Sequence, residues 1–408
     1  MKSTTRLGHK MFGNREKEIW SAPLVGPTQK LIASVLCVLF TFATLLVCHA
    51  SPDFSRPQTS DRRINMLVLG DSVMWGEGLK TENKSWYKVK TWLAKTTGRV
   101  VVERIEAHTG AIIEGADVNE TSRLPDGEVN VAVPTVNEQV NRALRFYNDG
   151  SRVDLVLVNG CANDVGARNL LNAAISTDEI RRLTEAKCGL PVEKLLRRIT
   201  SAFRNARVIV TGYYPFFSEK TGNNILLKAM ARRFFKDEPG ARQISSKVTL
   251  QRLIANSKVW YEQSNLSLAA AVARVNTELS RPQIAFTEIH FLPENSFGAG
   301  ESHLWSFDHS PFKRLMALLT FGKKKLGTND ERRKQRNASC DDYYQRQAND
   351  SSDQRKNREI DRLTCRYAAL GHPNRKGAAL YAEAITSQLK SGISETPWLS
   401  DEGVRERP

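Results

Sequence analysis

The sequence INMLVLGDSVMWGEG, residues 64–78, decides how the rest of the chain is interpreted. Residues 66–69 form an apolar run with the length of a buried parallel strand. The run ends at Gly70-Asp71-Ser72, which would place a serine hydroxyl at the tip of a rigid strand, within reach of a substrate. Gly, Asp and Ser also favour ordinary turns, so the tripeptide alone does not make Ser72 a nucleophile. The remaining sequence has to decide between these two interpretations.

Stretches typical of strands and helices alternate along most of the chain. Apolar or β-branched runs predict five strands, at residues 66–69, 99–105, 153–158, 206–212 and 284–291. Helical spacing of apolar residues predicts helices at 85–95, 136–147, 177–205 and 375–389, the third of them broken near Pro191. This alternation predicts a mainly parallel five-stranded sheet covered by helices on both faces, an α/β/α sandwich.

The first fifty residues differ in composition from the rest. Residues 1–30 are polar and basic, whereas residues 31–50 carry no charged side chain over a length close to that needed to span a bilayer. Because the basic flank comes first, residues 1–30 are expected on the cytoplasmic side and the remainder outside it. Residues 31–50 are either an uncleaved signal anchor or a signal peptide cut after Ala50. The protein is therefore expected to be membrane-anchored or secreted.

The rest of the chain divides by composition into a linker, a main domain and a tail. Residues 51–63 form a polar linker, residues 64–395 the main domain and residues 396–408 the tail. Within the domain, residues 220–280 are partly amphipathic but rich in charge, which indicates a helical insertion. Residues 322–362 are strongly polar and basic, and such a stretch is expected to be a solvated excursion.

The charge of the chain restricts its partners. It has 60 Lys and Arg residues against 44 Asp and Glu residues, a formal net charge of +16. This excess favours anionic surfaces such as lipid headgroups, acidic glycans or nucleic acid. The sequence contains no nucleic-acid-binding motif, so nucleic acid is not expected as a partner. Association with a membrane is expected through residues 31–50 if they are not cleaved.

Four cysteines follow residue 50, namely Cys161, Cys188, Cys340 and Cys365. An even number in an exported chain indicates two disulfides, with three possible connectivities. Pairing in sequence order is favoured, because each bond would then close a loop of about 25 residues and contribute about 3 kcal/mol. None of the spacings resembles a zinc site, and neither a metal nor another cofactor is expected.

Three loops with candidate catalytic residues follow the first three predicted strands. They contain Ser72, Gly110 and Asn163, and the carboxyl ends of parallel strands share the edge of the sheet where ligands bind. His372 precedes the last helix, can return to that edge and is the natural base for a serine near neutral pH. The main-chain N–H groups of Ser72 and Gly110 and the amide of Asn163 would then donate to an oxyanion, each donor contributing about 3 kcal/mol.

In order along the chain, these residues stand in four blocks that resemble the SGNH (GDSL-type) hydrolases. The blocks are GDSxxxGxG at 70–78, the single Gly110, GxxND at 160–164 and HPNxxG at 372–377. The resemblance covers about 64–215 and 283–390, with the helical insertion and the polar excursion outside it. It implies a flavodoxin-like α/β/α fold and the hydrolysis or transfer of acyl groups on lipids, glycans or small esters, without a metal.

The sequence departs from this family at one position. The aspartate that usually stands three residues before the histidine is Ala369 here. A third group is needed to orient the imidazole and to stabilise its charged form. Either a main-chain carbonyl near Ala369 or Leu370 takes this role, as in dyad members of the family, or a distant carboxylate such as Asp361 or Asp308 does. We favour the carbonyl.

The resulting hypothesis is an exported serine hydrolase that cleaves carboxylic esters through a covalent acyl-enzyme. Ser72 is the predicted nucleophile and His372 the predicted base, while Trp75 and Trp305 are candidate residues of substrate-shaping loops. One alternative is an O-acyltransferase or carbohydrate O-acetylesterase that acts on envelope or extracellular glycans. The other is a non-catalytic envelope-binding protein on the same fold, which only the missing aspartate favours.

Overall fold

The computed structural model describes residues 63–115, 128–129, 133–222, 246–308, 327–346 and 352–391. The predictions for residues 1–30 and 31–50, for the linker up to residue 62 and for the tail at 396–408 lie outside these ranges. None of the helices within the described ranges combines the length and the apolar character that a membrane crossing requires.

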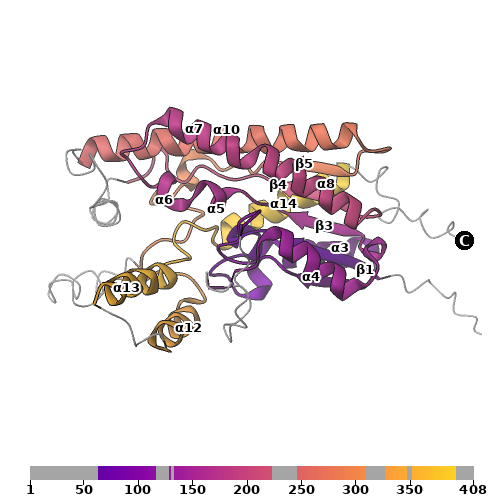
Figure 1. The fold of residues 1–408 in the computed structure, drawn as a ribbon, viewed down its shortest axis with the longest axis horizontal. Helices are drawn as coiled ribbons and strands as arrows, with labels where there is room; N and C mark the ends of the chain where they lie inside the picture. The colour runs from indigo at the N-terminus through magenta and orange to yellow at the C-terminus, as the bar shows by residue number, and fades with distance from the viewer. Residues whose placement is uncertain are drawn as a thin grey trace, which may run out of the picture. The chain divides into compact units, whose positions relative to one another are not determined.

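Five parallel strands form the central sheet in the order β2-β1-β3-β4-β5 (Figure 1). They are β1 (Ile64–Leu69), β2 (Val101–Ile105), β3 (Leu155–Val158), β4 (Arg207–Thr211) and β5 (Ile284–Thr287). This is the flavodoxin-like strand order, and it confirms the predicted five-stranded parallel sheet. The fifth strand is shorter than predicted, because the N–H of Phe291 bonds to the carbonyl of Ile289 at 3.0 Å in a turn that follows the ladder.

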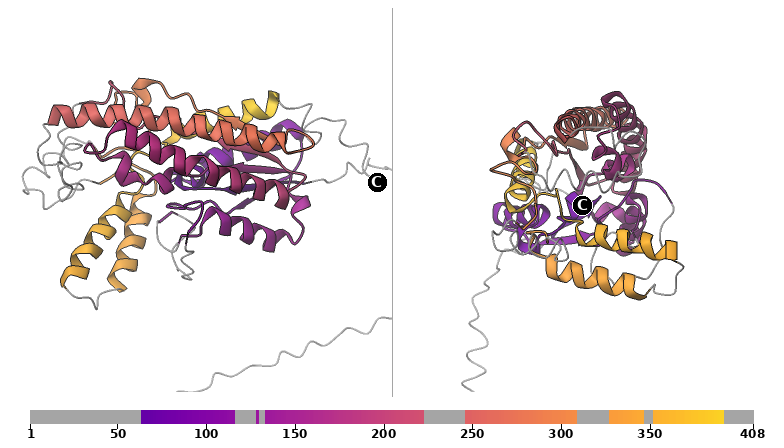
Figure 2. Two further views of the ribbon diagram at one scale, coloured as in Figure 1. Left: turned by 45° about the horizontal axis from the view of Figure 1, so that its top comes forward. Right: turned by 90° about the vertical axis from the view of Figure 1, so that its left-hand side faces the viewer.

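Helices lie on both faces of the sheet (Figure 2), and alternate residues of β1 pack against the two helical layers. Leu67 and Leu69 face one core, and Met66 and Val68 face the other. The first layer contains α4 (Val136–Tyr147), α7 (Thr177–Cys188), α8 (Leu190–Ala202) and α10 (Ser246–Thr277), and the second contains α3 (Ser85–Thr97) and α14 (Arg375–Ser391). A strand buried on both faces is expected to be apolar, as residues 66–69 of β1 are. The predicted α/β/α sandwich is therefore confirmed.

Short helices and 3₁₀ turns occupy several of the loops. They are α2 (Ser72–Trp75), η1 (Thr81–Asn83), η2 (Gly150–Arg152), α5 (Ala162–Val165), α6 (Ala167–Leu170) and η4 (Pro293–Asn295). The predicted break in the long helix is also present, since α7 ends at Cys188 and α8 begins at Leu190. Pro191 lies in the first turn of α8, where its missing N–H costs no helical hydrogen bond.

The described part of the predicted helical insertion is a helix of the sandwich itself. α10 connects β4 to β5 and packs against α7 and α8. Leu253, Trp260 and Leu268 on this helix are buried in the main core. The expectation of a helical insertion was wrong for these residues. Polar residues such as Asn256 and Asn265 also lie on the buried face, and they weaken the apolar periodicity in the sequence.

The described part of the polar excursion contains two helices that lie side by side (Figures 1 and 2). They are α12 (Arg333–Arg346) and α13 (Ser352–Arg366), and the disulfide Cys340–Cys365 joins them. The second disulfide, Cys161–Cys188, joins the residue before α5 to the end of α7, so the predicted pairing in sequence order is confirmed. Arg336 and both cysteines of the α12–α13 hairpin are fully buried, whereas most other described residues of the two helices are exposed or half-buried.

Candidate active site

The turn after β1 requires glycine at position 70. Gly70 has a φ of +127°, and a Cβ there would lie 2.0 Å from Asn159 Oδ1. The side chain of Gln139 brackets this residue: it accepts from the Gly70 N–H at 2.7 Å and donates to the Gly70 carbonyl at 3.0 Å. The N–H of His108 donates to the same carbonyl at 3.0 Å. The turn is thereby tied to α4 and to the loop after β2.

The buried carboxylate of Asp71 accepts hydrogen bonds that fix the serine loop. One of its carboxylate oxygens accepts from the Val73 N–H at 2.9 Å and from Asn159 Nδ2 at 2.8 Å. The other accepts from the Tyr213 hydroxyl at 2.7 Å. Burial raises the pKa of Asp71, and these hydrogen bonds oppose the rise. The carboxylate is thus occupied as the N-cap of α2, and Ser72 becomes the first residue of that helix.

The structure brings Ser72 and His372 together, although they lie 300 positions apart in the sequence. Ser72 Oγ is 2.7 Å from His372 Nε2, which is a hydrogen-bonding distance between a nucleophile and its base. Ser72 is 6% exposed, at the carboxyl end of β1. The contact places the two predicted catalytic residues in direct reach of each other.

Main-chain hydrogen bonds and the N-cap of α14 fix the segment that carries His372. The N–H of Trp305 donates to the His372 carbonyl at 2.8 Å, and the N–H of Gly371 donates to the Trp305 carbonyl at 2.9 Å. Asn374 caps α14, because its Oδ1 accepts from the Lys376 N–H at 2.9 Å. The HPNxxG block therefore specifies how the histidine enters the helix that follows it.

The imidazole of His372 is held neutral. Burial and, to a lesser extent, the positive charge of Arg336 lower the pKa of His372 to about 4, against an opposing effect of the main chain at residues 368–370. A neutral ring leaves Nε2 free to accept the proton of the serine near neutral pH.

No carboxylate of the described residues lies within hydrogen-bonding distance of His372. Asp308 instead pairs with Arg333 at 3.0 Å, and Asp361 is exposed on α13. Nδ1 of the histidine is buried and forms no hydrogen bond of ordinary geometry within the described ranges. The polar groups that favour its protonated form belong to the main chain of residues 368–370. A role for a main-chain carbonyl stays a prediction.

Hydrogen bonds tie the loops of Gly110 and Asn163 to each other. Asn163 Nδ2 donates to the Ala111 carbonyl at 2.9 Å, and the Asp164 carboxylate accepts from the Ile113 N–H at 3.1 Å. Asn163 retains a second amide hydrogen. The N–H groups of Ser72 and Gly110 donate to no acceptor in the described part of the chain. These three donors follow β1, β2 and β3, which are neighbours in the sheet.

The two candidate substrate-loop tryptophans are packed. Trp75 is 7% exposed, donates from Nε1 to Glu128 at 3.0 Å and carries the Lys84 ammonium 3.4 Å above its ring. Trp305 is 8% exposed and donates from Nε1 to the Glu77 carbonyl at 3.2 Å. Both side chains therefore form hydrogen bonds inside the protein. A contact of either tryptophan with substrate stays a prediction.

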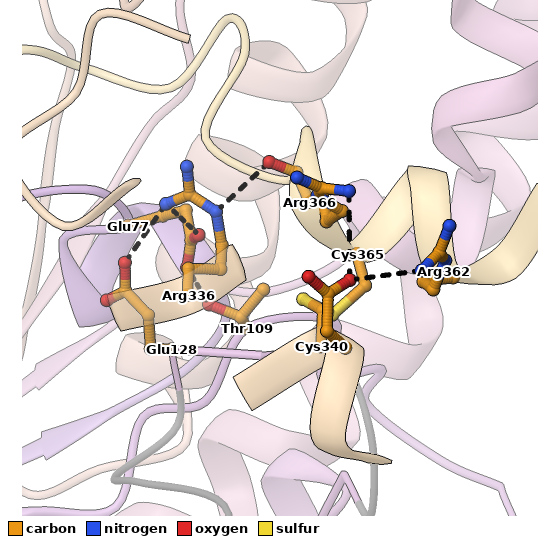
Figure 3. The surroundings of a disulfide bond; sticks show 9 residues. Glu77, Thr109, Glu128, Arg336, Cys340, Arg362, Cys365 and Arg366 are labelled. Carbon is orange, nitrogen blue, oxygen red and sulfur yellow. Dashed lines mark hydrogen bonds and ion pairs between the residues drawn. A yellow bond between two sulfur atoms is a disulfide. The ribbon is translucent and has the colours of Figure 1, made fainter. Parts of the chain in front are cut away.

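A buried cluster of charges beside the site was missed by the sequence reasoning. It joins Arg336 to the carboxylates of Glu77 and Glu128 (Figure 3) and to that of Asp330. The position of Glu77 between two glycines of the first block was an available signal. Arg336 stands in a run of similar basic residues, so nothing in the sequence distinguishes it. Within the described ranges, no group of His, Cys, Asp and Glu side chains is arranged to hold a metal ion.

Comparison with known proteins gives one family match and several similar structures. The model of the GDSL-like lipase/acylhydrolase family matches residues 66–385. An extracellular lipase from Streptomyces rimosus is 16% identical with a TM-score of 0.36, over 60% of this chain and 88% of that one. A phospholipase A1 from Streptomyces albidoflavus NA297 is 14% identical with a TM-score of 0.34, over 60% and 88%. A family 3 carbohydrate esterase from Clostridium thermocellum is 14% identical with a TM-score of 0.32, over 59% and 85%. Curated protein sequences gave no significant match.

The family match covers most of the chain and includes all four blocks identified in the sequence. It begins within β1 and ends within α14, so it spans the whole sheet and both helical layers. The serine and histidine of the first and last blocks are in contact in the structure. The chain belongs to the GDSL-like lipase/acylhydrolase family and is therefore a carboxylic ester hydrolase.

Proposed function

We propose that the protein hydrolyses carboxylic esters through an acyl-enzyme formed on Ser72. The observation that carries this proposal is the 2.7 Å contact between Ser72 Oγ and His372 Nε2. Oγ attacks the ester carbonyl as Nε2 takes its proton, and the same proton then leaves with the alcohol. A water molecule next gives a proton to Nε2 and attacks the acyl-enzyme, which releases the acid and restores both side chains.

The oxyanion of each tetrahedral intermediate would be held by the N–H groups of Ser72 and Gly110 and by the amide of Asn163. The lack of acceptors for the two main-chain donors among the described residues supports this role. The disulfide at Cys161, two residues before Asn163, and the bond from Asp164 to the Ile113 N–H fix these loops before a substrate arrives. Donors fixed in advance stabilise a developing charge without a cost of reorganisation.

We also propose that the catalytic part lies outside the cytoplasm. Two disulfides support this location, because such bonds persist mainly in oxidising compartments. The uncharged residues 31–50 fit the same location. Protease added to intact cells should then degrade the catalytic part, and protection of the whole chain would contradict the proposal.

Labelling with a fluorophosphonate probe tests the hydrolase mechanism. The native protein should be labelled on the peptide that contains Ser72, while heat-denatured protein and Ser72→Ala should not be labelled. A folded protein without any label would instead support the non-catalytic alternative. A panel of short and long acyl esters, phospholipids and acetylated sugars, with water or a sugar as acceptor, separates hydrolysis from acyl transfer.

The pH profile of kcat/KM should have its acid limb near pH 4. Only neutral His372 can act as base, and burial lowers its pKa to about 4, so activity should persist through pH 5 and fall below it. Between pH 6.5 and 4 the unfolded chain takes up a proton that the folded chain does not, so stability from this group is lost as the pH falls through that window.

A second titratable group near the site, Asp164, provides the control for this profile. Burial raises the pKa of Asp164 to about 6, and its carboxylate holds the Ile113 N–H. A limb near pH 6 that disappears in Asp164→Asn would belong to Asp164. A limb at about pH 6.5 that persists in this variant would show that His372 titrates like an exposed histidine, which contradicts the prediction.

Asn163→Ala is expected to lower kcat by about 100-fold with little change in KM, because one oxyanion donor acts mainly in the transition state. Steady-state kinetics on a soluble ester measures the effect. Asn205→Ala is the matched control, since Asn205 donates to the Ser151 carbonyl on a different loop. A loss of less than about threefold in Asn163→Ala would exclude the amide from the oxyanion site.

A further inference from the structure

Arg336 on α12 has a fully buried guanidinium (Figure 3). Its Nη1 lies 3.3 Å from Glu77 Oε1, 3.2 Å from Glu128 Oε1 and 3.0 Å from Asp330 Oδ1. Its Nη2 donates to Asp330 Oδ2 at 2.5 Å and to Thr328 Oγ1 at 3.2 Å. Removing such charges from water is costly, and a buried ion pair is by itself weak evidence for a stabilising role. The groups bound to its partners indicate another role.

Glu77 contacts the serine loop, the loop of Gly110 and, through Trp305, the segment that carries His372. Its N–H donates to the Ser72 carbonyl at 3.0 Å. Its Oε2 accepts from the hydroxyl of Thr109, the residue before the predicted oxyanion glycine, at 2.5 Å. Its carbonyl accepts from Trp305 Nε1 at 3.2 Å, and the main chain of Trp305 pairs with the histidine segment. A change in the position of Glu77 would therefore reach the nucleophile, the oxyanion loop and the base.

Glu128 supports the other side of the serine loop. Its carboxylate accepts from Trp75 Nε1 and from the Gly78 N–H, each at 3.0 Å. The guanidinium of Arg336 lies against one oxygen of Glu77 and one oxygen of Glu128. Burial and the neighbouring Glu128 raise the pKa of Glu77, and the guanidinium of Arg336 opposes this rise. Both carboxylates can then accept hydrogen bonds in the buried site.

The side chain of Arg336 is held next to the disulfide that joins the two helices of the hairpin. Cys340 lies one helical turn after Arg336 and is bonded to Cys365 on α13 (Figure 3). The next residue, Arg366, accepts from Arg336 Nε through its carbonyl at 3.4 Å. From there the chain reaches His372 in six residues. The guanidinium is thus held against both helices. The chain continues from the end of α13 to the catalytic base, His372.

We propose that Arg336 is a positioning residue for ester hydrolysis: from the disulfide-closed hairpin it holds Glu77 and Glu128, and through them it keeps Ser72, Gly110 and His372 in catalytic geometry. This inference rests on the proposed function. A role in stability alone would lower the folded fraction and leave the kinetics of the folded protein unchanged.

The charge of Arg336 gives the proposal a second readout. The charged groups around the guanidinium are the carboxylates of Glu77, Glu128 and Asp330, with Arg332 at 3.5 Å from Glu128. Arg336 itself favours the neutral form of the catalytic imidazole. Loss of its positive charge should therefore move the acid limb of kcat/KM to higher pH, an effect that a change in stability does not produce.

The test is the full chain with Arg336→Met, compared with Arg362→Met. Arg362 lies on the same hairpin, where it pairs with Glu359 at 2.8 Å outside the cluster. With active sites counted by the fluorophosphonate probe, Arg336→Met should lower kcat by about 100-fold with KM within about threefold, the size expected for a misplacement of about 1 Å. The acid limb should move up in this variant only.

Thr109→Val decides the question if Arg336→Met does not fold. This variant keeps every charge of the cluster and replaces the hydroxyl that donates to Glu77 by a methyl group of similar size. It should lower kcat by about tenfold, on the same positioning argument. A wild-type rate of labelling and an unchanged acid limb in folded Arg336→Met, or a wild-type kcat in Thr109→Val, would overturn the inference. Absence of labelling at Ser72 in the wild-type protein would instead overturn the proposed function.

Discussion

Ser72→Ala and His372→Ala are each expected to lower kcat for ester hydrolysis by about 10⁴-fold, and the double variant is expected to lose no more than either single variant. The two side chains act as one unit, because Ser72 Oγ lies 2.7 Å from His372 Nε2. A hydroxyl without its base stays protonated, and a base without the hydroxyl has nothing to activate. Steady-state kinetics on a short chromogenic ester measures all three losses.

Ser391→Ala is the control for this double-mutant cycle, because Ser391 is exposed at the end of α14 and should give wild-type kinetics. The oxyanion donors remain in every variant, so a small residual rate above that of water is expected. Losses that multiply in the double variant would show that serine and histidine act independently, and that the contact between them does not carry the reaction.

The histidine is expected to work without a carboxylate partner. Asp308→Asn and Asp361→Asn should therefore each keep kcat within about threefold of the wild-type value. Asp308 pairs with Arg333 and Asp361 is exposed on α13, so neither change acts directly on the imidazole. A loss of about a thousandfold in either variant would identify the missing acid and replace the main-chain carbonyl in the mechanism.

The sequence was informative wherever one physical requirement fixed the residue type. β1 is covered on both faces, so residues 66–69 had to form an unbroken apolar run, and this run is recognisable without any structure. α10 was misinterpreted because Asn256 and Asn265 stand on its buried face. There they bond to main-chain groups of neighbouring loops, as the 3.1 Å contact from Asn265 to the Tyr213 carbonyl shows. Buried polar side chains with tertiary partners have no sequence pattern of their own.

The same limit applies to the active site. Ser72 and His372 could be predicted because each stands in a block of residues with demanding turn geometry. Arg336 and Glu77 could not be paired in advance, because their contact depends on how a hairpin 259 positions away is placed. The missing aspartate at Ala369 was visible in the sequence, but its replacement depends on main-chain positions that only a structure supplies.

Gly371→Ala is expected to lower kcat by about 100-fold and the free energy of unfolding by about 2–4 kcal/mol. Gly371 has a φ of +76°, and a Cβ there would lie 1.9 Å from the ring of Phe216. That ring is stacked on Phe297 with centroids 5.2 Å apart, so it has little room to move. The carbonyl of Gly371 also accepts from the Tyr214 hydroxyl at 2.8 Å. The strain should therefore displace the adjacent His372.

Two other glycines separate the causes of this effect. Gly98 has a φ of +66°, and a Cβ there would have no described atom within 4 Å, so Gly98→Ala isolates the backbone strain, about 1–2 kcal/mol. A Cβ at Gly300 would also have no described atom within 4 Å, and its φ is not positive. Gly300→Ala should therefore leave the free energy of unfolding nearly unchanged. Chemical denaturation and kinetics of the three variants make the comparison. If Gly371→Ala lost only as much stability as Gly98→Ala and kept its kcat, Phe216 would have moved aside and the histidine would not depend on this contact.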